Sequence, residues 1–229
     1  PVHVDAVQAF GAIDVNFRAS GAATMAVSRH KVGAPVGIGA LFVRRDVTLH
    51  PLSHGGGQER DIRSGTMNVA AAAAFAAAAQ EAVQSLPVTI PKIVELRNRL
   101  IDGVLEQVPQ ARLSGPKDDD GSTRLPGNAH FIFPGCEGDS LLFMLDMQQV
   151  YSSTGSACTA GVPKPSHVLL AMGQTEADAR SVQRFTLGHD SDEKDVTHLI
   201  DAISPAYQRA LEAGMAAKTA RIKTASDGW

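Results

Sequence analysis

The sequence predicts an α/β fold, because short apolar strands alternate with helical runs and polar side chains gather where strands end. Residues 24–28 and 37–43 have the alternating or continuous apolar pattern of strands, and residues 69–83 and 93–107 have the pattern of helices. In α/β folds, ligand-binding groups collect where buried strands end in loops. Lys31 follows the first of these two strands. We therefore expect the chemistry of the protein near Lys31.

Composition narrows the class of protein. The chain has 229 residues, enough for one large domain or two modest ones, and its formal charge of −3 does not suggest nucleic acid or an anionic membrane as a partner. An alanine-rich run at residues 69–83 is expected to be too short and too weakly apolar for a membrane span, which needs about 18 apolar residues. Two cysteines, Cys136 and Cys158, do not make a disulfide framework. We therefore expect a reducing, cytoplasmic setting.

The first residues look like the middle of a buried strand, so we expect further sequence before Pro1. Residues 3–8 then indicate a strand end that turns into a short helical segment. Asp5 and Gln8 have the spacing of side chains that point the same way on a helical turn. Beside an aromatic cofactor, Asp5 would keep a ring nitrogen protonated and Gln8 would donate to a ring oxygen. The more ordinary interpretation is an aspartate that caps the turn and a glutamine on the surface.

The segment Ser28-Arg29-His30-Lys31 follows a strand and leads into a glycine- and proline-containing loop. An amine beside a hydroxyl and an imidazole suggests a lysine that forms a Schiff base, with neighbours that hold a phosphate. The alternative is a solvated lysine at a strand end. The next strand, at residues 37–43, is almost continuously apolar, so we expect it to be buried on both faces.

Residues 54–66 form a glycine-rich segment with two arginines. The consecutive glycines at 55–57 suit a backbone that passes close to another group or takes positive φ. Arg60 and Arg63 carry forked donors for anions, and the hydroxyls and amides of residues 64–66 suit a phosphate. The alternative is a flexible surface loop.

Prolines at 87 and 91 separate the alanine-rich helix from the amphipathic helix, so we place the domain boundary there, with domains at 1–88 and 89–229. Pro205 is expected to interrupt the last helix, and the tail beyond residue 213 is expected to fray. In the second domain the sequence predicts strands at residues 111–114, 127–133 and 183–188, and helices at residues 140–146, 166–172, 177–182 and 193–211.

Two reactive groups stand out in the second domain. Residues 151–163 are mostly small, so they bury little apolar area and should form a mobile loop around Cys158. An accessible cysteine there suits a nucleophile, whereas we expect Cys136, at a strand end, to be an inert structural thiol. Arg184 lies inside an apolar strand and needs an anionic partner. That partner is either a substrate carboxylate or, as the alternative, a structural ion pair.

Five motifs, occurring in this order, together resemble the cysteine desulfurases. These are pyridoxal-phosphate enzymes of the class V aminotransferase type, which supply sulfur for iron–sulfur clusters. The long small-residue loop resembles the nitrogen-fixation and housekeeping cluster-assembly branch. The resemblance implies the C-terminal part of the aspartate-aminotransferase-like fold, a remnant of the large, mostly parallel-sheet domain followed by a small α+β domain. The motifs are residues 3–8, 28–31, 54–66, 152–161 and 184–188.

The resemblance assigns one group of residues to the cofactor. Lys31 would bind pyridoxal 5′-phosphate covalently, and Ser28 and His30 would hold its phosphate. Asp5 would pair with the ring nitrogen and make the ring an electron sink, and Gln8 would contact the ring oxygen.

The resemblance assigns a second group to the substrate and the partner chain. Thr66 would reach the phosphate of the partner subunit's cofactor, which implies a homodimer. Arg184 would bind the carboxylate of L-cysteine, and Cys158 would take its sulfur as a persulfide and leave L-alanine. The sulfur would pass to an iron–sulfur scaffold protein or another acceptor, with Cys158 as a candidate transient ligand of an iron–sulfur cluster.

Two departures from the family pattern accompany the resemblance. Arg29 stands where the family usually has a small residue. The N-terminal half of the large domain is not in the chain, so the chain by itself is not expected to be a complete enzyme.

Another enzyme of the superfamily, a selenocysteine lyase or a class V aminotransferase, is the first alternative. Cys158 argues against an aminotransferase, which does not need it. A catalytically inactive remnant that dimerises or binds a scaffold is the second alternative, if no N-terminal half exists.

Overall fold

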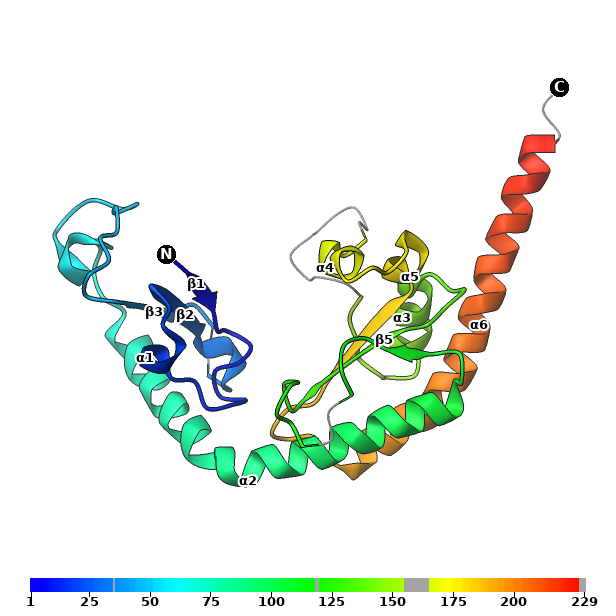
Figure 1. Cartoon of the computed structure of the whole chain (residues 1–229), viewed down its shortest axis with the longest axis horizontal. Coiled ribbons are helices and arrows are strands. Elements are labelled where there is room, and N and C mark those ends of the chain that lie inside the picture. Colours follow the sequence, from blue (N-terminus) through cyan, green and yellow to red (C-terminus); the bar gives the residue numbers. More distant parts are fainter. Residues whose placement is uncertain (35, 118–119, 155–164, 227–229) are drawn as a thin grey trace. The chain divides into compact units, whose positions relative to one another are not determined.

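A computed structural model describes residues 1–34, 36–117, 120–154 and 165–226 (Figure 1). The chain divides into two compact units, residues 1–90 and 91–229, and each is described by itself. The boundary expected from the sequence lay between residues 88 and 89. Helix α2 (Val69–Gln107) runs through the division.

The first unit is built on a three-stranded sheet in the order β1-β2-β3. Strand β1 (His3–Asp5) runs parallel to β2 (Thr24–Ser28), and β3 (Gly39–Val43) runs antiparallel to β2. The helix α1 (Phe17–Ser20) is capped by the side chain of Asn16 and precedes β2. The core of this unit consists of Ala6, Met25 and Val27, with Val4, Phe10, Val15, Phe17 and Phe75 packed against them.

The expectation that residues 37–43 are buried on both faces is wrong for this chain. Leu41 and Phe42 point to opposite faces of β3, and they are 50% and 44% exposed. The physical reason is that β3 is the edge strand of a small sheet, bonded only to β2 among the described strands. The apolar sequence of β3 shows that the strand is suited to burial, but within this unit its side chains stay partly exposed.

The expectation of two helices separated at the prolines is also wrong, because α2 is continuous and contains Pro87 and Pro91. An interior proline costs roughly 3 kcal/mol. Apolar contacts on both sides offset this cost, since Leu86 and Ile93, two helical turns apart, are 8% and 4% exposed.

The length of α2 also corrects the expectation about membrane spans. The alanine-rich run is part of this helix, which is the one described helix long and apolar enough by composition to cross a membrane. Core helices of soluble proteins can be equally long and apolar, so this is weak support for a membrane protein. Core helices of that kind are mostly buried, however, whereas only 11% of the most apolar stretch of α2 is buried.

The second unit is built on an antiparallel sheet in the order β4-β5-β6. Its buried apolar side chains form a large cluster, in which Phe131, Phe133 and Leu141 are fully enclosed, and a smaller one. The strands are β4 (Arg112–Leu113), β5 (Asn128–Ile132) and β6 (Val182–Thr186), and the helices are α3 (Gly138–Asp146), α4 (His167–Ala171), α5 (Glu176–Arg180) and α6 (Glu193–Ser226).

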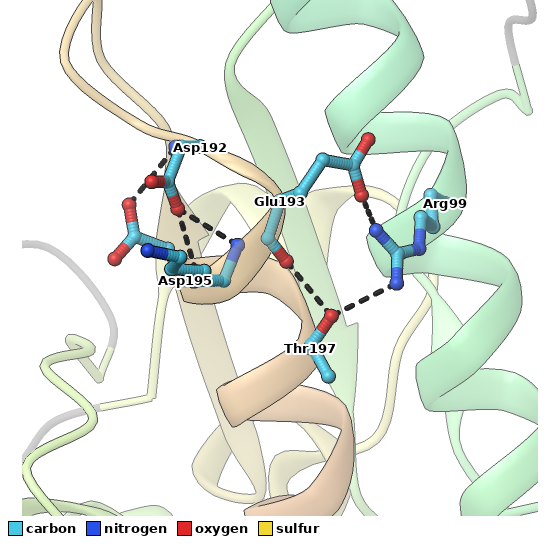
Figure 2. Close-up of polar contacts among 6 residues, drawn as sticks. Arg99, Asp192, Glu193, Asp195 and Thr197 are labelled. Carbon is cyan, nitrogen blue, oxygen red and sulfur yellow. Dashed lines mark hydrogen bonds and ion pairs between the residues drawn. The ribbon is translucent and has the colours of Figure 1, made fainter.

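Helix α6 begins with a reciprocal cap, drawn in Figure 2. The Asp192 carboxylate accepts from the amides of Lys194 and Asp195, and the Asp192 amide donates to the Asp195 carboxylate at 3.0 Å. These amide bonds hold the pKa of Asp192 below its usual value. Arg99 on α2 pairs with Glu193 and donates to Thr197 at 2.8 Å, which ties the two helices together.

The expected interruption at Pro205 and the expected end of the helix at 211 are wrong. Helix α6 contains Pro205 and continues to Ser226. Ile203, Ala206 and Tyr207 around the proline are buried, and the Tyr207 hydroxyl donates to the carbonyl of Pro134 at 2.6 Å. Core packing therefore outweighs the lost backbone bond, and the alanine- and lysine-rich sequence beyond it has high helix propensity.

Candidate active site

Lys31 lies on a short 3₁₀ turn (η1, Arg29–Lys31) that begins directly after β2. The carbonyl of Arg29 accepts from the amides of Val32 and Ala34 at 3.0 and 3.4 Å, which closes the turn. The side chain of Lys31 is exposed. The structure therefore presents its amine at the carboxyl end of a strand, where the sequence predicted it.

Ser28 and His30 come together on this turn. The Ser28 hydroxyl and the Nδ1 atom of His30 share a hydrogen bond of 2.6 Å. Ser28 is the last residue of β2 and pairs in register with Gly39, where a side chain would meet the carbonyl of Val27. A hydroxyl and an imidazole are thus held side by side next to a lysine, as a phosphate site requires.

Asp5 ends the neighbouring parallel strand. It pairs with Ala26 of β2, so Asp5 and Ser28 lie near the same carboxyl edge of the sheet. One carboxylate oxygen of Asp5 accepts from the amide of Val7 at 3.0 Å. That bond is the turn cap that the ordinary interpretation predicted. Asp5 and Gln8 are both exposed.

Thr66 is exposed and lies on a separate segment of the same unit, just before α2. Among the described residues it makes no hydrogen bond to Ser28, His30 or Lys31. The adjacent Gly65 has φ +128° and its amide donates to the side chain of Gln58 at 2.9 Å. The segment is therefore held by its own contacts. The structure of this chain does not bring Thr66 to the 3₁₀ turn Arg29–Lys31, which we call the lysine turn.

The backbone takes left-handed conformations at residue 57 and at residues 59–61, a few positions before Thr66. Gly57 has φ 78°, as expected for one of the three glycines, and the φ values of Glu59, Arg60 and Asp61 are 52°, 57° and 64°. Each non-glycine residue in this region costs roughly 1–2 kcal/mol. Such strain collects at functional segments, which agrees with a functional interpretation of residues 54–66.

Arg184 lies in the second unit, on β6, and its Nε atom is buried without a hydrogen-bond partner. The described residues contain no ion pair to Arg184, so the structural ion pair offered as an alternative is not found there. Its backbone exchanges two hydrogen bonds with Ser153, at 2.8 and 3.1 Å. An unpaired buried guanidinium donor suits an external anion such as a carboxylate.

His130 is a residue that the sequence reasoning missed. It pairs in register with Arg184, and its Nδ1 atom shares a 2.9 Å hydrogen bond with Ser114. Burial, followed by the charges of Arg184 and Arg124, lowers the pKa of His130 to about 4. A histidine within the apolar strand at residues 127–133 was the signal that could have identified it.

The two cysteines differ in what can be said of them. Cys158, predicted as the nucleophile and as a transient cluster ligand, lies outside the described residues. Cys136 is buried, donates to the carbonyl of Phe133 at 3.3 Å, and has its pKa raised to about 12 by that burial. A buried thiol with such a pKa is protonated at neutral pH, which supports the interpretation of Cys136 as a structural thiol.

The donor set at the carboxyl edge of the first sheet fits pyridoxal 5′-phosphate. The exposed amine of Lys31 suits a covalent bond to an aldehyde, the Ser28–His30 pair suits a phosphate, and Asp5 suits a protonated ring nitrogen. The first unit is therefore an α/β sheet whose central strand β2 ends in a turn that carries an exposed lysine beside a hydroxyl–imidazole pair.

The model of the family "Aminotransferase class-V" matches residues 1–199, and the chain belongs to this family. An IscS-like cysteine desulfurase of Mycobacterium tuberculosis is 52% identical over 217 residues, which cover 95% of this chain and 54% of the relative. A cysteine desulfurase IscS of Clostridium botulinum is 39% identical over 201 residues, which cover 88% of this chain and 50% of the relative. These matches confirm the family resemblance seen in the motifs.

Solved structures agree with the sequence relatives. A NifS-like protein from Rickettsia africae superposes with a TM-score of 0.78 at 30% identity, covering 90% of this chain and 53% of that one. A second NifS-like protein gives a TM-score of 0.77 at 32% identity. The predicted fold class is thereby confirmed. The chain spans about half the length of the curated relatives that it matches.

Proposed function

We propose that the chain is the C-terminal part of a pyridoxal-phosphate-dependent cysteine desulfurase, a sulfurtransferase that converts L-cysteine to L-alanine. The observation that carries this proposal is the lysine turn. Ser28 and His30 share a 2.6 Å hydrogen bond beside Lys31, on the strand next to Asp5. The names of the relatives support the same activity.

In this proposal the first unit holds the cofactor. Lys31 binds it through its amine, Ser28 and His30 donate to its phosphate, Asp5 keeps its ring nitrogen protonated, and Gln8 contacts its ring oxygen. When bound, pyridoxal 5′-phosphate supplies an electron sink for the substrate.

The second unit supplies the substrate-binding and sulfur-accepting groups. The forked guanidinium of Arg184 binds the carboxylate of L-cysteine. The thiolate of Cys158 attacks the substrate sulfur, so a sulfur–sulfur bond forms while the substrate's carbon–sulfur bond breaks. The electron pair of the broken bond returns to carbon, which takes a proton and becomes the methyl group of L-alanine. Ser153 lies five residues before Cys158 in the sequence and is bonded to Arg184 on β6. This bond supports the proposal that Arg184 and Cys158 act on the same substrate.

The persulfide on Cys158 then needs an acceptor. We propose an iron–sulfur scaffold protein or another sulfur acceptor, with Cys158 as a transient cluster ligand, in a homodimer whose Thr66 reaches the phosphate in the partner subunit. The exposed position of Thr66 supports this role. We propose a cytoplasmic location, since this chemistry needs reduced thiols.

Other functions of the same family remain candidates to be tested. A selenocysteine lyase uses the same cofactor, and a class V aminotransferase needs no nucleophilic cysteine. An inactive dimerisation or scaffold-binding remnant has no use for an ordered Ser28–His30 pair. The presence of both Cys158 and this pair favours the desulfurase.

The experiment compares wild-type protein, expressed from its complete gene, with the Lys31→Ala and Cys158→Ser variants. Each is mixed with L-cysteine and a reductant, and sulfide, alanine and the visible absorption band of the lysine-bound cofactor are measured. The wild type should release equal amounts of sulfide and alanine. Lys31→Ala should lose the band and the activity, and Cys158→Ser should keep the band and lose sulfide release. Normal sulfide release by Cys158→Ser would overturn the assignment of the nucleophile.

A further inference from the structure

Arg29 is the first residue of the 3₁₀ turn that carries Lys31, and unlike the two residues that follow it, it is buried. Its side chain is 3% exposed, whereas His30 and Lys31, which follow it on the same 3₁₀ turn, are exposed. Arg29 therefore faces the interior of the first unit. Its position between Ser28 and His30 does not make it part of their hydrogen-bonded pair.

The guanidinium of Arg29 contacts the first turn of helix α2. Its Nη1 atom donates to the carbonyl of Ala71 at 2.9 Å. Helix α2 begins at Val69, so Ala71 is distant in the sequence but lies within the same unit. One side chain thus connects the turn that follows β2 with the start of the long helix.

The backbone of Arg29 holds the rest of the turn. Its carbonyl accepts from Val32 and Ala34, and its amide donates to the carbonyl of Ile38 at 3.4 Å. Three residues that follow Lys31 in the sequence are therefore bonded to the backbone of the same residue that contacts α2. A shift of Arg29 would move the backbone that carries Lys31.

The turn is also closely packed at Val32, where Gly11 lies against it. Gly11 has φ +78°, and a side chain at Gly11 would lie 2.6 Å from Cγ1 of Val32 and 3.4 Å from the side chain of Ala82 on α2. The backbone at Gly11 therefore fits closely between the turn and the helix. The turn therefore approaches α2 closely at Gly11 as well as at the Arg29 bond.

The burial of Arg29 is costly, which argues that its contact has a purpose. Among the described residues it makes no ion pair, and its Nε atom is buried without a hydrogen-bond partner. A buried charge without a counter-charge lowers stability, so an apolar residue would fill this place at less cost. General stabilisation of the fold does not explain an arginine here.

We infer that Arg29 is a positioning residue that ties the lysine turn to the first turn of helix α2, so that Lys31 and the Ser28–His30 pair keep one arrangement before the cofactor binds. The importance of this arrangement for catalysis rests on the proposed function. The tether itself is a property of this chain and is testable without the cofactor.

The test compares the Arg29→Met and Arg45→Met variants of the complete protein after removal of the cofactor. Arg45 is an exposed arginine of the same unit, so its variant is the matched control. Hydrogen exchange is measured at the amides of Val32 and Ala34 and at the paired strands β2 and β3. In Arg29→Met the two turn amides should exchange at least tenfold faster, while the strand amides change less than twofold.

Two results would overturn the inference. One is exchange at Val32 and Ala34 in Arg29→Met at the rate found in Arg45→Met. The other is equal acceleration in the turn and in β2 and β3, because Arg29 would then stabilise the whole unit. If Arg29→Met does not fold, Arg29→Gln, which has a shorter and uncharged polar side chain, is judged by the same comparison of turn and strand amides.

A second readout connects the tether to the cofactor. Pyridoxal 5′-phosphate should dissociate at least fivefold faster from Arg29→Met than from Arg45→Met, with a shifted visible absorption maximum. Equal dissociation rates and spectra would show that the tether has no influence on Lys31. If the wild type binds no cofactor at Lys31, the proposed function fails, and the exchange measurement still decides whether the tether exists.

Discussion

His130 and Arg184 lie directly opposite each other on strands β5 and β6. The imidazole of His130 shares a 2.9 Å hydrogen bond with Ser114, and burial together with the charges of Arg184 and Arg124 lowers its pKa to about 4. His130 is therefore uncharged at neutral pH. A neutral neighbour leaves the positive charge of Arg184 available for an anion.

The lowered pKa of His130 predicts that the protein loses stability in acid. The pKa of His130 is about 4 in the folded chain and close to 6.5 in the unfolded chain, so the unfolded chain binds the proton first as pH falls. The folded state is favoured above pH 6.5, and its advantage falls between pH 6.5 and pH 4 by at most about 1.4 kcal/mol per pH unit. Urea unfolding at pH 7 and pH 5 measures the loss.

The His130→Asn variant isolates this residue from the other histidines. An asparagine still bonds to Ser114 but does not titrate, so the difference in unfolding free energy between pH 7 and pH 5 should be smaller in the variant by roughly 1–2 kcal/mol. An identical pH dependence in the wild type and the variant would show that His130 is not the titrating group.

We expect Arg184→Met to weaken substrate binding without unfolding the protein. The side chain has a buried donor without a partner, so its removal breaks no described side-chain bond. The loss of a charged, forked contact to a carboxylate is worth roughly 1.5–3 kcal/mol, or about a 10- to 150-fold rise in the KM for L-cysteine. Steady-state kinetics and thermal melting measure both effects.

The control for this substitution is Arg209→Met, which changes an exposed arginine of α6 in the same unit. It should leave the KM for L-cysteine unchanged. A normal KM in Arg184→Met would place the carboxylate site elsewhere.

Ser28→Ala should weaken the binding of pyridoxal 5′-phosphate. The variant loses the 2.6 Å hydrogen bond that orients His30, and with it one hydroxyl donor. A bond of this kind contributes about 1 kcal/mol, so the dissociation constant should rise roughly fivefold. Titration of the cofactor-free protein, followed by visible absorption, gives the constant. Ser85→Ala, on the exposed side of α2, is the matched control and should bind as tightly as the wild type.

Asp192→Ala should destabilise the second unit through the start of helix α6. The carboxylate of Asp192 satisfies two amides of the first turn, and such caps are worth about 1 kcal/mol. Urea unfolding should show this loss at pH 7, whereas Asp201→Ala, on the exposed face of the same helix, should change stability by less than about 0.5 kcal/mol. Equal stabilities of the two variants would exclude a role for the cap.

Local sequence patterns predicted much of the candidate site. The alternation at residues 24–28 predicted β2 with the bounds that the structure has, and the small and polar residues that follow predicted the turn that carries Lys31. These predictions succeed because strand periodicity and turn chemistry depend on neighbours in the sequence. The roles of Cys158 and Thr66 came from the motifs and stay predictions.

Tertiary structure decided the features that depend on distant residues. The pairing of His130 with Arg184 and the contact of Arg29 with Ala71 each join segments far apart in the chain, so no local pattern contains them. Packing also overruled local signals, because buried contacts on both sides of Pro87 and Pro205 keep α2 and α6 continuous. The sequence by itself predicted a hydroxyl, an imidazole and an amine together at the end of β2. Only the fold decided which of their neighbours hold them in place, since burial and register arise from contacts between distant segments.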